Sequence, residues 1–189
     1  MELENYDEIM LDFEEKLDKK IERLNYEYSI IRAGRANPRM LDKVMVNYYG
    51  TMTPLSQTSN ISVPEARMIV ISPWDTSLVK EINKAILASD LGVSPSDDGR
   101  VIRLVFPALT EERRKEIVKK VKAICEETKV GIRNDRRDVL EVFKKAEKDK
   151  KMTEDDRKTA ENEVQKVTDK YTQLADSTCA AKEKDIMEI

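Results

Sequence analysis

The sequence contains no histidine, which bears directly on catalysis. Histidine is the usual general acid or base near neutral pH, so the commonest enzymatic proton carrier is missing. The sequence also lacks a glycine-rich phosphate loop, a nucleophile elbow and a cluster of metal ligands. We therefore expect a protein that is not an enzyme and that needs neither a cofactor nor a bound metal.

Cysteine is scarce, and long apolar runs are missing. Cys125 and Cys179 are the only cysteines, and no Cys-Cys or Cys/His motif is present, so neither a zinc site nor a disulfide framework is indicated. Cys125 lies in the apolar phase of its helix, and we expect it in the core. The first five residues are acidic, without the apolar stretch of a signal peptide. No apolar run approaches the roughly 18 residues of a membrane span. These features predict a reduced, cytoplasmic protein.

Aromatic residues make up only 5% of the chain, whereas charged residues make up 38%, a balance typical of long exposed helices. The net charge of −3 is unevenly distributed. Residues 1–36 and 151–189 are net acidic, whereas residues 110–150 carry more basic than acidic groups. This separation, rather than the net charge, indicates a local surface that could bind a polyanion.

Three long segments have the spacing of amphipathic helices. The first covers about residues 2–33, the second begins near Thr110 and continues for nearly 40 residues, and the third begins at Thr153. Such helices can bury their apolar faces together in an elongated three-helix bundle. For the third helix, the coiled-coil-like 4-3 spacing predicts an apolar face of Ala160, Val164, Val167, Tyr171, Leu174, Thr178 and Ala181.

Between Lys43 and Pro107 the periodicity changes to that of strands. Tyr48 and Tyr49 end the first of these strands, and because neighbours in a strand face opposite sides, we expect at least one of them in the core. Asp97, Asp98 and Gly99 are typical of a hairpin turn. Strands are predicted at 44–49, 61–63, 68–71 and 101–105, with one helix from Asp75 or Thr76 to Leu87.

The order of these elements predicts an α+β protein with two domains. Residues 1–33 and 108–189 would form the three-helix bundle, and residues 37–105 an inserted small α/β domain. The chain crosses between them at 33–37 and 105–108, and two short connections can act as a hinge. The hinge candidates are Ala33, Gly34, Arg35, Ala36, Val105, Phe106 and Pro107.

A one-sided row of positive charge lies on the second long helix. At about 100° per residue, Arg133, Arg136 and Arg137 fall within an arc of about 100°, and Asp135 points to the far side. Aligned guanidinium groups suit a polyanion with regularly spaced phosphates, although such a row can also be solvated or bind an acidic partner helix. The same sector contains Lys115, Lys119, Lys122, Lys129 and Lys144.

Arg32 and Arg35 lie at the end of the first helix, and two interpretations of them remain open. They are cations at a helix C-terminus, where the helix dipole favours positive charge. They could also be a second anchoring point for the same polyanion. The candidate RNA-binding residues are Arg133, Arg136, Arg137, Lys129, Lys122, Arg32 and Arg35.

Short motifs are spread along the whole chain. They are IRAGRANP at 31–38, YYGT at 48–51, PL at 54–55, ASDLG at 88–92, PALTEERRK at 107–115, IRN at 132–134 and RRD at 136–138. In this order and at these separations, they resemble the bacterial ribosome recycling factors. One position departs from the family pattern, because the residue between Asn134 and Arg136 is usually apolar and here is Asp135.

The resemblance implies an L-shaped molecule in which a two-stranded hinge joins the bundle to the small domain. It implies a monomeric translation factor that binds the post-termination bacterial ribosome, with the bundle against large-subunit ribosomal RNA. With elongation factor G and GTP, such a factor splits the ribosome into subunits, and the GTPase belongs to the partner. The RNA contacts implied by the family motifs fall on Arg32, Arg35 and Arg133, with Arg136 and Arg137 in the same motif.

Two other classes of function compete with this interpretation. One is a helical scaffold whose basic row binds an acidic protein partner, which predicts protein binding without ribosome association. The other is a hydrolase that works without histidine, which predicts turnover of a substrate by the isolated chain.

Overall fold

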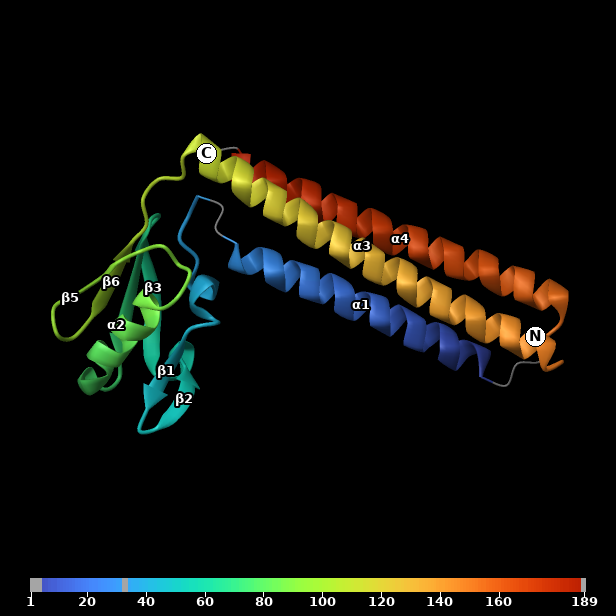
Figure 1. The fold of residues 1–189 in the computed structure, drawn as a ribbon, viewed down its shortest axis with the longest axis horizontal. Helices are drawn as coiled ribbons and strands as arrows, with labels where there is room; N and C mark the ends of the chain where they lie inside the picture. The colour runs from blue at the N-terminus through green and yellow to red at the C-terminus, as the bar shows by residue number, and fades with distance from the viewer. Residues whose placement is uncertain (1–4, 32–33, 188–189) are drawn as a thin grey trace. The chain divides into compact units, whose positions relative to one another are not determined.

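The computed structural model describes residues 5–31 and 34–187. The chain divides into two compact units, Met1–Tyr28 with Val118–Lys184, and Ser29–Ile117 with Asp185–Ile189. We call the first the helical unit and the second, which contains the strands, the sheet unit (Figure 1). Together they give the chain a two-part α+β architecture. No helix in the described part of the chain combines the length and hydrophobicity that a membrane crossing requires.

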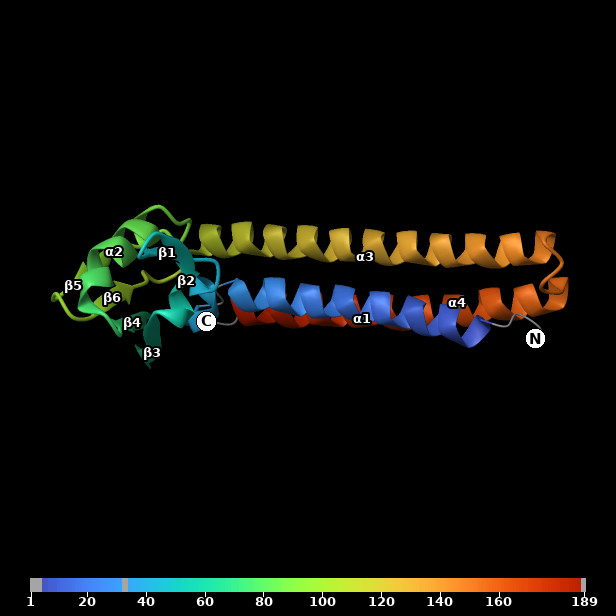
Figure 2. The same ribbon diagram turned by 90° about the horizontal axis from the view of Figure 1, so that it is seen from below.

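The helical unit is built from α1 (Tyr6–Ile30), α3 (Glu111–Lys148) and α4 (Glu154–Met187). The three helices lie side by side, and α3 runs antiparallel to the other two (Figures 1 and 2). The buried apolar residues of α1 and α3 are those that the periodicity predicts. They are Phe13, Leu17, Ile21, Leu24 and Tyr28 on α1, and Val121, Cys125, Ile132, Val139, Phe143 and Ala146 on α3.

The predicted apolar face of α4 is partly wrong. Leu174 is 42% exposed and Ala181 is exposed, and the buried positions instead continue through Thr168 and Ala175. A buried threonine fits here because its hydroxyl donates to the Val164 carbonyl at 2.7 Å, which leaves no unsatisfied polar group. The buried face of α4 consists of Ala160, Val164, Thr168, Tyr171, Ala175, Cys179 and Ile186.

Hydrogen bonds from three tyrosines set the register of the bundle. Tyr171 on α4 donates to the Asp18 carboxylate on α1 at 2.6 Å, and Tyr6 on α1 donates to Glu163 on α4. Tyr28 donates to the Val121 carbonyl on α3 at 2.9 Å. Burial, followed by the bond to Asp18, raises the pKa of Tyr171 to about 12, so this hydroxyl remains a donor at physiological pH.

The sheet unit contains a two-stranded hairpin and a four-stranded antiparallel sheet. The hairpin pairs β1 (Met45–Tyr48) with β2 (Thr51–Pro54). The sheet has the order β3-β4-β6-β5, formed by Ser59–Glu65, Met68–Pro73, Ile102–Val105 and Pro95–Asp97. The sequence pattern missed β2 and β5, which are short strands without an alternating apolar pattern.

One apolar core holds this unit together. The inward residues Ile69 and Ile71 of β4 pair in register with Leu104 and Ile102 of β6. Helix α2 (Val79–Leu87) packs its buried side against the same core, which explains the strong apolar face of that short segment. The α2 residues in this core are Val79, Ile82 and Ile86.

Side chains cap several of the turns that precede or join these elements. Asn37 caps the short turn Pro38–Leu41 by accepting from the Arg39 amide at 3.0 Å. The predicted hairpin turn between β5 and β6 is confirmed, with Asp98 Oδ1 accepting from the amides of Arg100 and Val101, each at 3.0 Å. Asp75 caps the turn that precedes α2.

Candidate nucleic-acid interface

The candidate interface is carried by α3, a single continuous helix. Its start is capped by Thr110, whose Oγ1 accepts from the Arg113 amide at 3.2 Å, and its first turn is acidic. Its last turn carries Lys145 and Lys148, which complement the dipole at the other end. A helix of this length holds charged side chains at a fixed rise of about 1.5 Å per residue.

Arg133 and Arg137 lie on the open side of α3. Ile132, which directly precedes Arg133, is fully buried in the bundle, and this orients the Arg133 side chain outward. Within the described residues, neither arginine forms an ion pair. Arg136 is half-buried, and its Nε atom is buried without a hydrogen-bond partner in the described structure. Two guanidinium groups one helical turn apart are therefore available to an external anion.

Two lysines of the row, Lys122 and Lys129, are in a different state, because acidic side chains pair with them. Lys129 is only 15% exposed and lies 2.5 Å from Glu126 and 2.9 Å from Asp176 of α4. The hydrogen bond to Glu126, followed by that to Asp176, raises the pKa of Lys129. Lys122 lies 3.4 Å from Glu183. No group of three or more histidine, cysteine or acidic side chains in the described part is placed to hold a metal ion.

Asp135 points away from Arg133 and is occupied within the bundle. Its Oδ2 lies 3.1 Å from the Lys20 ammonium of α1, at an angle that makes an ion pair rather than a hydrogen bond. Gly131, one turn earlier on α3, leaves room for this lysine, since a Cβ added there would lie 3.3 Å from the Lys20 side-chain carbons. The charged residue at this position is thus paired with α1, on a different side of α3 from Arg133.

The other candidate residues lie elsewhere in the chain. Arg32 and Ala33 fall outside the described residues, and Arg35 is exposed on the sheet unit. Ala36 and Phe106, two of the hinge candidates, are both buried. Their amides donate to the carbonyls of Ala66 and Arg67, at 2.7 and 2.8 Å respectively, which ties both connecting segments to the turn between β3 and β4.

The remaining hinge candidates differ in conformation and burial. Gly34 has a φ of +79°, in the left-handed region that favours glycine. Val105 and Pro107 are exposed. All the described hinge candidates fall within the Ser29–Ile117 part of the sheet unit.

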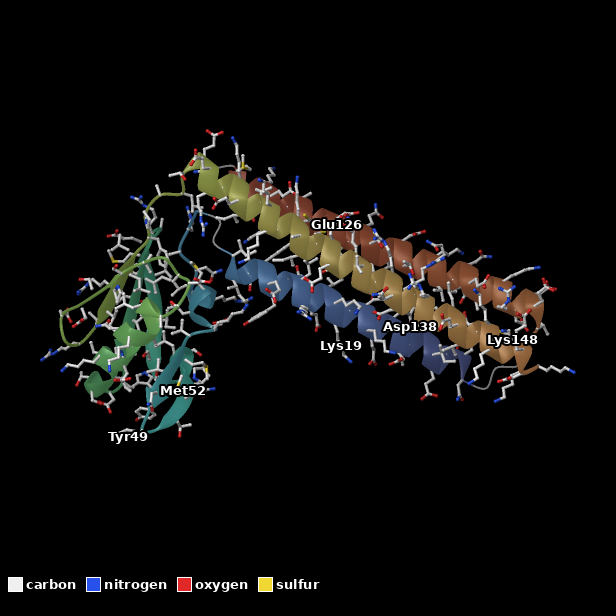
Figure 3. The ribbon with its side chains drawn as sticks, viewed as in Figure 1. Lys19, Tyr49, Met52, Glu126, Asp138 and Lys148 are labelled. Carbon is white, nitrogen blue, oxygen red and sulfur yellow. The ribbon has the colours of Figure 1, made fainter. Side chains whose placement is uncertain are left out.

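Aromatic residues gather at the surface of the sheet unit, where the sequence predicted partial burial. Tyr48 is 36% exposed and Tyr49 is 84% exposed, so neither is a core residue. The strand ends at Tyr48, and Tyr49 adopts a φ of 48° at the tip of the hairpin (Figure 3), so the alternation of sides assumed for a strand does not apply. Trp74 is also exposed.

A comparison with known protein families identifies the chain. A profile described as ribosome recycling factor matches residues 24–187. The chain belongs to the ribosome recycling factor family. Ribosome-recycling factor of Caldicellulosiruptor bescii is 59% identical over 93% of this chain and 96% of its own length. That of Clostridioides difficile is 57% identical over 96% of this chain and 98% of its own length. The family consists of translation factors that are not enzymes.

Solved structures of family members share this architecture. A solution structure of a ribosome recycling factor matches with a TM-score of 0.78 and 38% identity over 98% of this chain and 99% of that chain. A second match is the T. thermophilus ribosome recycling factor, described with E. coli elongation factor G as bound to the E. coli post-termination complex. It has a TM-score of 0.65 and 40% identity over 96% of this chain and 98% of that chain. The α+β fold expected from the sequence is confirmed.

Proposed function

We propose that this chain binds the post-termination bacterial ribosome and, with elongation factor G and GTP, splits it into subunits for reuse. Membership of the ribosome recycling factor family over most of the chain supports this function most strongly. The structural neighbour described with elongation factor G on a post-termination complex supports the same partners. The factor would work in the cytoplasm, where bacterial ribosomes translate.

We further propose that the open side of α3 contacts large-subunit ribosomal RNA through Arg133 and Arg137. Both guanidinium groups are exposed and make no ion pair within the described residues, so phosphate binding would not require an internal pair to break. Lys122 and Lys129 contribute less to this contact, because each already has a carboxylate partner. Arg35, Arg136 and Arg32 remain candidates for further contacts.

The splitting step would use the two units as separate bodies. The helical unit would be anchored by its RNA contacts, while elongation factor G would move the sheet unit about the two connecting segments. The GTPase belongs to the partner. The segments 33–37 and 105–108 are the proposed pivots. Because Ala36 and Phe106 are hydrogen-bonded to the β3–β4 turn, these two residues would move together with the sheet unit.

The test is binding to purified bacterial large ribosomal subunits across a salt series, with Arg133→Ala beside the unmodified chain. We expect salt-sensitive binding, a weaker affinity for the variant, and a salt slope reduced by about one unit for one lost phosphate contact. Arg113→Ala is the matched control, because Arg113 lies on the far side of the same helix and its guanidinium is paired with Glu116 at 2.7 Å.

Each alternative outcome has a defined meaning. Equal slopes for all three proteins would remove Arg133 from the RNA contact. An equal loss in both variants would indicate a general charge effect rather than a site. Absence of ribosome binding, together with capture of an acidic protein, would favour the scaffold function over recycling.

A further inference from the structure

The two cysteines, far apart in sequence, share one cavity in the helical unit. Cys125 on α3 and Cys179 on α4 are 3% and 7% exposed, and both are free thiols. A cavity of about 340 Å³ opens along the seam between α3 and α4, and both cysteines line it. The small exposed parts of both thiols therefore face a cavity that is open to solvent.

Contacts across the seam bring the two thiols to the same level of the bundle. Cys125 Sγ lies 3.7 Å from the Ala175 carbonyl oxygen of α4. Ala175 is one helical turn before Cys179 on the same buried face, so the Cys125 side chain faces the turn that ends at Cys179. The α3 thiol therefore points across the seam to α4, and Cys125 is among the groups that interact with the Cys179 thiol.

A carboxylate accepts a hydrogen bond from one thiol and favours its protonated form. Cys179 Sγ donates to Glu183 Oε1 at 3.3 Å, and Glu183 is held by Lys122 at 3.4 Å. Burial, the largest cause, raises the pKa of Cys179 to about 12, so its thiolate is scarce at neutral pH and oxidation should quicken as pH rises. The titratable groups around the pair are Tyr28 from α1, Lys122, Glu126 and Lys129 from α3, and Asp176 and Glu183 from α4.

We propose that Cys125 and Cys179 form an oxidation site at which hydrogen peroxide closes a disulfide between α3 and α4. In the first step Cys179 loses its proton to solvent, and its thiolate sulfur attacks peroxide. The S–O bond forms, the O–O bond breaks, and the leaving hydroxide takes the proton back as water. Cys125 then attacks the sulfenic sulfur, the S–S bond forms, and the departing hydroxide leaves as water with the Cys125 proton. Two thiols and one peroxide thus yield one disulfide and two waters.

The disulfide would link α3 and α4 covalently. Along the chain, these helices are connected through the turn between Lys148 and Glu154, far from both cysteines. A disulfide that closes a long loop lowers the entropy of the unfolded chain, so the oxidised protein should unfold at a higher temperature. Reduction by a dithiol reverses the bond, which makes the site a reversible modification of the helical unit.

The experiment treats the reduced, full-length protein with hydrogen peroxide in the absence of added thiol. We expect loss of both free thiols, an intact mass lower by two hydrogens, and a peptide that links Cys125 to Cys179. The unfolding temperature should rise, and dithiothreitol should reverse every change. Cys125→Ala and Cys179→Ala, checked for folding by circular dichroism, should each lack the mass change and the rise in unfolding temperature.

A matched pair of variants tests the effect of Glu183 on the thiol. Glu183→Gln should quicken disulfide formation severalfold at neutral pH, because it removes a carboxylate that favours the protonated thiol. Glu126→Gln, which removes a carboxylate from the same cavity without a thiol contact, should leave the rate unchanged. Equal rates in both variants would overturn the role of Glu183. The site itself would be overturned if the folded protein kept both thiols, formed only intermolecular dimers, or accumulated sulfinic acid at Cys179 without a link.

Discussion

At the scale of single residues, the turn between β5 and β6 depends on one ionised carboxylate. Asp98 accepts hydrogen bonds from the amides of Val101 and Arg100, and these bonds, more than the nearby Arg103, lower its pKa to about 2. The folded pKa is below the ordinary value of about 3.9, so the stabilisation is present above pH 4 and is lost as pH falls towards 2.

The variant Asp98→Asn tests this pH dependence. Its unfolding midpoint should lie below that of the unmodified chain at pH 6, and the difference should shrink between pH 4 and pH 2. Fluorescence of Trp74, the only tryptophan and a residue of the sheet unit, is a suitable probe. Asp90→Asn removes the same charge from an exposed site in the same unit. For this control, the difference in unfolding midpoint from the unmodified chain should not shrink between pH 4 and pH 2. A constant difference across this pH range would contradict the assignment.

The residues of the basic row show what a helical wheel can and cannot predict. The outward position of Arg133 follows from its apolar neighbour Ile132, and the structure bears this out. One partner of Lys129, Glu126, is visible in the sequence as an i,i+3 pair, but Asp176 reaches it from α4. The wheel describes one helix, whereas charge neutralisation depends on the register between two.

At the scale of elements, α4 offers a test with two adjacent residues. Leu174 fits the coiled-coil spacing but is 42% exposed, whereas Ala175 is fully buried. Leu174→Ala should change the free energy of unfolding by less than about 0.5 kcal/mol. Ala175→Leu should lower it by about 1–3 kcal/mol, since Ala175 is fully buried and the added atoms would crowd the side chains packed around it. Chemical denaturation monitored by helical circular dichroism measures both changes. A larger loss of stability for Leu174→Ala than for Ala175→Leu would favour the apolar face predicted from the sequence, which includes Leu174.

The elements also differ in how far the sequence determines them. The long helices were predictable because their periodicity, caps and breakers agree over many residues. The strands β2 and β5 were not, since each is held by pairing with a neighbour rather than by an apolar pattern of its own. The exposed position of Tyr49 was missed for a related reason, because the last residue of the strand was not distinguishable from the first residue of its turn.

At the scale of the whole molecule, the proposed mechanism requires relative movement of the two units. Gly34 lies in one connecting segment with a φ of +79°, which proline, fixed near −65°, cannot adopt. We expect Gly34→Pro to redirect this segment, so that large-subunit binding through α3 is retained while splitting with elongation factor G and GTP is largely lost. Light scattering of post-termination ribosomes measures the splitting, and sedimentation measures the binding.

A second glycine provides the control for this variant. Gly92 has a φ of +67° and lies in the sheet unit, outside both connecting segments. Gly92→Pro imposes a comparable backbone conflict, so it should destabilise the sheet unit locally while subunit splitting continues at a temperature where the unit is folded. Full splitting activity of Gly34→Pro would contradict the pivot proposed at this segment.

Because Lys20 contacts Asp135 and passes beside Gly131, the effects of substitutions at these three positions depend on one another. In this chain, exchange of Asp135 for leucine would leave the partly buried Lys20 ammonium without its partner. The same exchange made together with Lys20→Met should cost far less. Replacement of Gly131 by a larger residue would displace the lysine stem and so remove the benefit of the aspartate. The effect of each substitution thus depends on the residues at the other two positions, an instance of epistasis between α1 and α3.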